Sequence, residues 1–248
     1  MNKTLSVMLA AGLLVSGVAG AAEKPAVAFT PEQEARIGEI AKDYLLAHPE
    51  VLVEVSQKLQ AQQQEKQQQA MTAAVVQNQA ALLNDKGTPS YGPADAKVTV
   101  VEFFDYQCVF CSRFAPELEK VMKAQPDVRY LFKDWPIFGG RWEASLQAAQ
   151  QGLTVWQKKG PQAYVTYHNA IYATGHNEGK LTAEDIHGAA SKAGLTTPIP
   201  GDHTASLEKN SNLAEALGLT GTPGIIVMPV SGATPDTITV FPEAVTAD

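Results

Sequence analysis

At 248 residues the chain is long enough to form one large domain, or one domain with an extension, and to bury a core without a scaffold of disulfides. Its formal net charge of −7 is accompanied by scattered basic residues. This pattern excludes the concentrated basic surface of a nucleic-acid-binding protein or of a protein that binds an anionic membrane, so we treat the charge as a solubility feature.

The first 21 residues have the pattern of a secretory signal. Lys3 precedes an apolar stretch from Leu5 to Val18, and the small residues Ala-Gly-Ala at 19–21 predict cleavage after Ala21. A transmembrane anchor is the alternative, but the apolar run is short and is interrupted by serine and glycine. We therefore expect the mature protein to be exported.

Residues 22–86 are expected to form a helical stalk. A capping box at 30–33, with proline at the first helical position, starts a helix that runs to Ala47. The dipeptide at 48–49, His-Pro, breaks it, and a second helix extends to about Asn84. The apolar stripe of the second helix is thin and is interrupted by a polar stretch at 60–69; its members are Leu52, Val55, Leu59, Ala73, Val76, Ala80 and Leu83. Such a helix must pack on a partner, which predicts an oligomerisation stalk with a weak centre; a solvated linker helix is the alternative.

Residues 92–248 are expected to form an α/β domain, after a boundary rich in turn residues. The predicted elements are strands at 98–106, 128–133, 225–228 and 237–241, a helix at 112–123 and a helical block at about 142–217. This order predicts a small sheet with helices inserted between its strands.

The only two cysteines, Cys108 and Cys111, form a Cys-x-x-Cys motif where the first strand gives way to a helix. Unpaired N–H groups and the helix dipole at a first turn lower a thiol pKa. We therefore predict a redox-active dithiol with Cys108 at the exposed helix start and Cys111 as the shielded resolving thiol. Structural zinc needs four ligands, and His168 and His176 lack the usual spacing. A metal site and a structural staple remain the alternatives.

Together these elements resemble the thioredoxin fold with an inserted helical domain found in DsbA-family periplasmic thiol-disulfide oxidoreductases. Two motifs carry the resemblance: residues 101–108, Val-Glu-Phe-Phe-Asp-Tyr-Gln-Cys, and residues 221–224, Gly-Thr-Pro-Gly. The long N-terminal arm narrows it to the trimeric subgroup of ScsC- and BcfH-like proteins. The resemblance implies a periplasmic homotrimer joined through its stalk, with exported cysteine-containing proteins as substrates, a membrane redox partner that resets the dithiol, and neither cofactor nor metal.

Four residues around the dithiol are expected to contact substrate. Val109 and Phe110 lie in the active-site turn, where simple packing is the alternative, and they replace the His and Pro of strongly oxidising members of the family. We therefore expect a less oxidising pair. By resemblance, Pro223 is cis and faces the dithiol, which leaves the backbone of Thr222 free to pair with an extended peptide. A threonine before this proline is more typical of isomerases and reductases.

Two charged residues are candidates for proton transfer. Glu102 lies on a strand expected to be buried beneath the dithiol, where a carboxyl pKa is raised and the group could relay protons to Cys111. Lys133, on the neighbouring strand, is its candidate partner. The alternative for each is an exposed charged residue.

The leading hypothesis is a trimeric disulfide isomerase with some dithiol oxidase activity, because several active sites facing a shared space raise the effective concentration of thiols around a client. A Cu(I)-binding or client-holding thiol protein is the alternative, since soft thiolates suit that ion. The sequence stops at Asp248, where the resembling proteins begin a last helix. Without that helix, we expect residues 225–228 to be uncovered and stability to be lowered.

Overall fold

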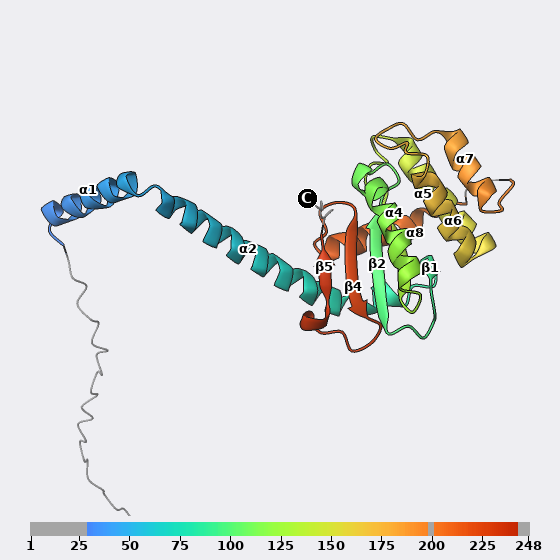
Figure 1. The fold of residues 1–248 in the computed structure, drawn as a ribbon, viewed down its shortest axis with the longest axis horizontal. Coiled ribbons are helices and arrows are strands. Elements are labelled where there is room, and N and C mark those ends of the chain that lie inside the picture. Colours follow the sequence, from blue (N-terminus) through green and yellow to red (C-terminus); the bar gives the residue numbers. More distant parts are fainter. Residues whose placement is uncertain (1–28, 198–200, 243–248) are drawn as a thin grey trace, which may run out of the picture. The chain divides into compact units, whose positions relative to one another are not determined.

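The computed structural model describes residues 29–197 and 201–242 (Figure 1). The chain divides into two compact units, with the boundary between Gln57 and Lys58. The signal predicted at residues 1–21 lies outside the described residues. Within the described ranges, no helix combines the length and the apolar character needed to cross a membrane.

The N-terminal unit contains α1 (Pro31–Ala47) and the first part of α2 (Glu50–Gln77). The predicted capping box is present: the N–H of Gln33 donates to Thr30 Oγ1 at 3.3 Å, and the N–H of Thr30 donates to Gln33 Oε1 at 2.9 Å. Phe29, which precedes α1, is exposed, and so are large apolar residues of α1 and of the start of α2: Ile37, Ile40, Tyr44, Leu45, Leu46, Leu52, Val53, Val55 and Leu59. The arm therefore presents the apolar surface that packing on a partner requires.

The C-terminal unit is built on a five-stranded sheet in the order β1-β3-β2-β4-β5. Its strands are β1 (Ser90–Tyr91), β2 (Val98–Phe104), β3 (Arg129–Asp134), β4 (Gly224–Pro229) and β5 (Thr239–Phe241). Strands β2 and β3 are parallel, and the other neighbours are antiparallel. The predicted α/β sheet with helices inserted between its strands is confirmed.

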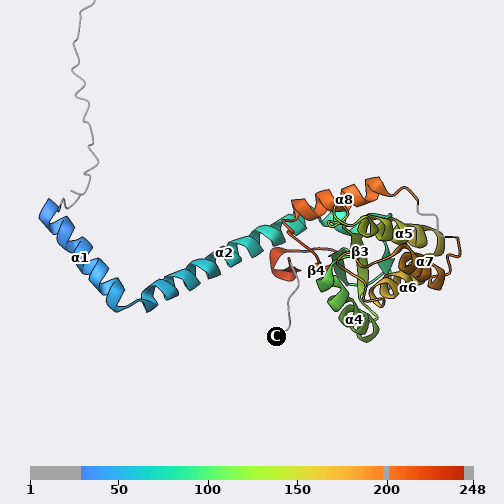
Figure 2. The same ribbon diagram turned by 90° about the horizontal axis from the view of Figure 1, so that it is seen from above.

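Helices cover both faces of this sheet, and Figure 2 shows α4 and α8 on opposite sides of it. The first face packs against α4 (Val109–Ala124), α5 (Glu143–Lys159), α6 (Pro161–Tyr172) and α7 (Ala183–Lys192). The second face packs against the end of α2, α3 (Gln79–Leu83) and α8 (Thr204–Ala216). The predicted helical block therefore divides, with α5 to α7 in one core cluster and α8 mainly in the other.

The second core contains residues that the sequence pattern assigned to the stalk. Met71, Val75 and Leu82 are buried there against Ile226 and Met228. The domain core thus begins within α2, well before residue 92. For the same reason, the expectation that residues 225–228 are uncovered is wrong: Ile226 is 0% exposed and Met228 is 1% exposed.

Candidate active site

The nucleophilic thiol occupies the N-cap of α4. Cys108 has extended backbone angles, as is usual at an N-cap, and its Sγ accepts a hydrogen bond from the N–H of Cys111 at 3.4 Å. A hydrogen bond from the Cys111 side chain is the largest of the causes that lower the pKa of the Cys108 thiol to about 6, although burial of the thiol opposes this shift. Burial, followed by the bond to Cys108, raises the pKa of Cys111 well above its usual value. The two thiols are therefore set apart as nucleophile and resolving group.

The loop before β4 closes over this thiol. The Thr222–Pro223 peptide bond is cis, as predicted, and Cys108 Sγ lies 3.2 Å from the carbonyl oxygen of Thr222. Cys108 is only 3% exposed, less than the sequence pattern predicts, because this loop lies against it. The Thr222 backbone thus faces the dithiol.

Asp105 shapes the turn that delivers Cys108 to the helix. Its carboxylate accepts from the N–H of Gln107 at 2.7 Å, the N–H of Phe138 at 2.9 Å and Ser145 Oγ at 2.8 Å. Its carbonyl oxygen accepts from the N–H of Cys108 at 3.0 Å. Burial raises the pKa of this carboxyl, and the hydrogen bonds oppose that shift. The side chain ties the turn to the loop after β3 and to α5.

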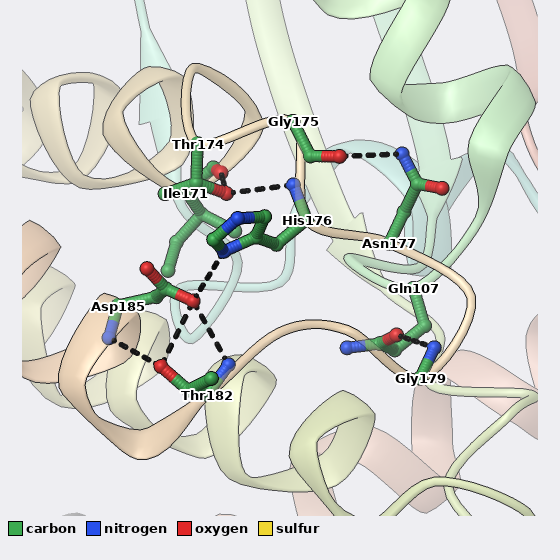
Figure 3. Close-up of polar contacts among 9 residues, drawn as sticks. All are labelled: Gln107, Ile171, Thr174, Gly175, His176, Asn177, Gly179, Thr182 and Asp185. Atoms are coloured by element: carbon green, nitrogen blue, oxygen red, sulfur yellow. Dashed lines mark hydrogen bonds and ion pairs between the residues drawn. The ribbon is translucent and has the colours of Figure 1, made fainter.

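Gln107, the residue before the nucleophile Cys108, is hydrogen-bonded to the loop between α6 and α7 (Figure 3). The N–H of Glu178 donates to the carbonyl oxygen of Gln107 at 3.0 Å, and the N–H of Gly179 donates to Gln107 Oε1 at 2.6 Å. Gly179 has φ +90°, and a Cβ there would lie 2.7 Å from Trp142 Nε1. Only glycine fits this position without displacement of the ring or the backbone. The helical insertion therefore supports the catalytic turn directly.

Glu102 lies beneath the dithiol on the face of β2 that packs against α4 and α6. It is 1% exposed, and neither of its carboxyl oxygens has a hydrogen-bond partner among the described residues. Burial, followed by the nearby charges of Asp134 and Cys108, raises the pKa of this carboxyl to about 8. The nearest basic atom in an ion-pair arrangement is His168 Nε2, 3.8 Å from Glu102 Oε2. A buried acid with this pKa can exchange protons near neutral pH.

Lys133 is not the partner of Glu102, and this expectation is wrong. In the sheet register Phe132 stands opposite Glu102, so Lys133 projects from the other face. Its Nζ donates to Thr88 Oγ1 at 2.6 Å and lies 3.6 Å from Asp85 Oδ2. Burial lowers the pKa of this lysine to about 8. Its contacts tie the segment before β1 to the sheet and are remote from the dithiol face.

Known proteins that are similar to this chain have the same fold around the dithiol. Residues 84–245 match the sequence model of the thioredoxin family, and residues 33–66 match that of the copper resistance protein ScsC N-terminal domain. The crystal structure of BcfH from Salmonella enterica Typhimurium shares 39% sequence identity and a TM-score of 0.71, over 85% of this chain and 90% of that chain. The chain belongs to the thioredoxin family, among its DsbA-like proteins of the ScsC and BcfH type.

Other relatives support the same family and its chemistry. Proteus mirabilis ScsC, in a transitional conformation, shares 30% identity and a TM-score of 0.58, over 88% of this chain and 91% of that chain. Disulfide bond formation protein D from Bacillus subtilis (strain 168) is 29% identical over 157 residues, which are 57% of this chain and 68% of that protein. The protein is thus a thiol-disulfide oxidoreductase of the thioredoxin family, as predicted.

The remaining substrate-contact predictions concern the dipeptide of this family's active-site motif. Phe110 is 40% exposed, and the guanidinium of Arg113 lies 5.6 Å from the centre of its ring. Val109 is partly buried. Phe110 is therefore the apolar side chain available to a client next to the thioredoxin-type dithiol, and its role in substrate binding stays a prediction.

Sequence reasoning missed four residues that the fold brings to this site: Asp105, Gln107, Asp134 and His168. Asp105 and Gln107 stand inside the motif that carries the family resemblance, but the motif by itself indicates no role for them. The sequence draws attention to His168 only as a zinc ligand that lacks the usual spacing. The signal that could have found it is its spacing, since tyrosines four residues before and four residues after it place it on one aromatic stripe of a helix.

Proposed function

We propose that this protein is a disulfide isomerase with some dithiol oxidase activity, acting on exported proteins through Cys108. The supporting observation is the arrangement of its thiols: Cys108 caps α4 with a thiol pKa lowered to about 6, while the thiol pKa of Cys111 is raised. Near neutral pH the first sulfur is a thiolate ready to attack, and the second retains its proton.

Isomerisation needs no net transfer of electrons. The Cys108 thiolate attacks one sulfur of a client disulfide, the other client sulfur leaves as a thiolate, and a mixed disulfide forms. A different client thiolate then attacks the client sulfur of the mixed disulfide, which forms a new client disulfide and releases Cys108. In oxidation, the disulfide between Cys108 and Cys111 accepts two electrons from two client thiols, and a membrane redox partner must then reoxidise the pair.

Thr222 favours the isomerase direction. Its backbone carbonyl contacts the Cys108 sulfur, and its buried hydroxyl has no hydrogen-bond partner among residues 29–197 and 201–242. A hydroxyl without a partner, on the residue whose carbonyl contacts the nucleophilic sulfur, is available to donate a hydrogen bond to a bound client, which would favour release of the client thiolate and a second round of exchange.

The exposed apolar arm supports assembly into a trimer in the periplasm. BcfH and ScsC are similar to this chain along most of its length, including the arm. Another similar protein, 32% identical over 62% of this chain and 84% of its own, is described as a periplasmic thioredoxin-like protein from Salmonella enterica serovar Typhimurium. Three active sites joined by such arms would raise the effective concentration of thiols around one bound client.

The test uses the full mature chain with a polar arm, because deletion of the whole predicted stalk, residues 22–86, would remove Met71 and Val75 from the domain core. In the double variant Ile40→Gln and Leu52→Gln, we expect a monomer that reduces a small disulfide normally but fails to refold scrambled ribonuclease. Lys42→Gln, on the same exposed helix, is the matched control. A monomeric variant with full isomerase activity would contradict the proposal.

Copper binding is the second candidate, favoured by the match of the arm to the copper resistance protein ScsC N-terminal domain. In the part of the chain that the structure describes, no cluster of three or more His, Cys, Asp or Glu side chains is arranged to hold a metal ion. Two thiolates alone can bind Cu(I), because both are soft ligands. Titration of the reduced protein with Cu(I), beside Cys111→Ser, separates this role from thiol exchange: tight binding without ribonuclease refolding would favour copper.

A further inference from the structure

His168 is a buried histidine that the thiol chemistry above does not use. It lies on α6, is 1% exposed, and is enclosed by five aromatic rings whose centres are 4.9 to 6.4 Å away: Phe104, Tyr106, Phe132, Tyr164 and Tyr172. Its Nδ1 lies 3.2 Å from Asn169 Oδ1. Because an amide oxygen only accepts hydrogen bonds, this contact places the ring proton on Nδ1 and leaves a lone pair on Nε2.

That lone pair faces Glu102. The two atoms Nε2 and Oε2 are 3.8 Å apart, and neither has a hydrogen-bond partner among the described residues. An ionised carboxylate would put two acceptors face to face in a buried site, which is costly. A protonated carboxyl can donate its O–H to Nε2 after a small rotation, so a single proton satisfies both groups.

The other titratable groups around this pair supply no positive charge. They are Asp134 of β3, Cys108 at the N-cap of α4, Cys111 within α4, Tyr106 before the helix, and Tyr164, Tyr167 and Tyr172 of α6. Tyr164 already donates to Asp134 Oδ2 at 2.9 Å, and Lys133 projects from the opposite face of the sheet. Burial lowers the pKa of His168 to about 4, so the ring itself is neutral near pH 7. A carboxylate at Glu102 would therefore be uncompensated.

We propose that His168 is a positioning residue that holds a proton on Glu102 for delivery to Cys111. This rests on the thiol exchange proposed above. When a client thiolate attacks Cys108 of the oxidised protein, the disulfide bond to Cys111 breaks and its electron pair goes to the Cys111 sulfur. The proton of Glu102 then passes to that sulfur. In the reverse step, Cys111 returns its proton to Glu102 as its sulfur attacks the mixed disulfide and the client departs as a thiolate.

The first experiment measures the rate at which dithiothreitol reduces the oxidised protein across a range of pH. Since a hydrogen bond from the Glu102 carboxyl to His168 favours the protonated acid, His168→Phe should lower the midpoint of the Glu102-dependent step by roughly half to one pH unit, the effect of one hydrogen bond. His168→Gln, which retains an acceptor oxygen, should restore part of the shift. His187→Gln on the exposed side of α7 is the matched control and should leave the midpoint unchanged.

The second experiment reads the histidine itself and needs no variant to fold. Nitrogen-15 shifts of the His168 ring in the wild-type protein should show the neutral Nδ1–H form from mildly acidic to mildly alkaline pH. An Nε2–H form, a ring that titrates in that range, or an unchanged midpoint in His168→Phe would each overturn the inference. Failure of ribonuclease refolding would refute the isomerase proposal alone, because neither experiment uses a protein client.

Discussion

Replacement of Glu102 by glutamine should make the protein more stable at neutral pH. The pKa of this carboxyl rises from 4.5 to about 8 on folding, with burial as the main cause. An acid whose pKa is raised in the folded state contributes fully to stability below its unfolded pKa. That contribution is lost as pH rises towards the folded value, because the unfolded chain releases a proton that the folded chain retains.

The magnitude follows from the size of the shift. Each pH unit between about 4.5 and 8 lowers the free energy of unfolding by about 1.4 kcal/mol, which amounts to about 3 kcal/mol at pH 7. Glutamine has nearly the same volume and no charge in either state, so Glu102→Gln should recover about 3 kcal/mol and reduce the slope by about 1.4 kcal/mol per pH unit. Asp134, whose pKa is also raised to about 8, keeps a residual slope of the same sign in the variant.

Urea unfolding followed by tryptophan fluorescence measures this at several pH values between about 7 and 7.5, above the ordinary histidine pKa of about 6.5. Glu117→Gln, an exposed residue on α4, is the matched control and should change neither the stability nor its slope. If Glu102→Gln were no more stable than wild type, or if the two slopes agreed, the carboxyl would not be held in its protonated form. The same variant should slow reduction of the disulfide, because it has no proton to give to Cys111.

Three further experiments have definite expected outcomes. The rate of alkylation of Cys108 in the reduced protein should rise with pH with a midpoint near pH 6, the pKa of its thiol, while Cys111 should not be labelled. Equal labelling of both sulfurs, read by mass spectrometry, would contradict the assignment of nucleophile and resolving thiol. Lys133→Met should leave the rate of thiol exchange unchanged. It should lower stability only slightly, because burial disfavours the charge of the Lys133 side chain. A large loss of exchange rate would instead indicate that Lys133 has a catalytic role. Gly179→Ala should lower stability by about 1 to 3 kcal/mol and slow thiol exchange, because the alanine would have a positive φ and its Cβ would contact the Trp142 ring. Gly188→Ala, which has open space around its Cβ, is the control in thermal melts.

Local features of the sequence were enough to predict the start of the arm's first helix, the reactive dithiol and the proline loop that faces it. The capping box at Thr30, the Cys108 motif at a strand-to-helix junction and Pro223 in its loop each depend on neighbours within a few residues. Backbone preferences and helix-end electrostatics act over that distance, so the residues themselves specify the outcome. The raised pKa predicted for Glu102 also followed from apolar flanks that indicate a buried strand.

Tertiary structure alone decided which side chains meet. The sequence predicts that Lys133 pairs with Glu102 because the two lie on neighbouring strands, yet a register offset of one residue places them on opposite faces of the sheet. His168 reaches Glu102 only because α6 crosses the same face as α4, and Met71 enters the core only because α2 ends against α8. These contacts join residues far apart in the chain, and hydrophobic periodicity shows that a face is buried without showing what covers it.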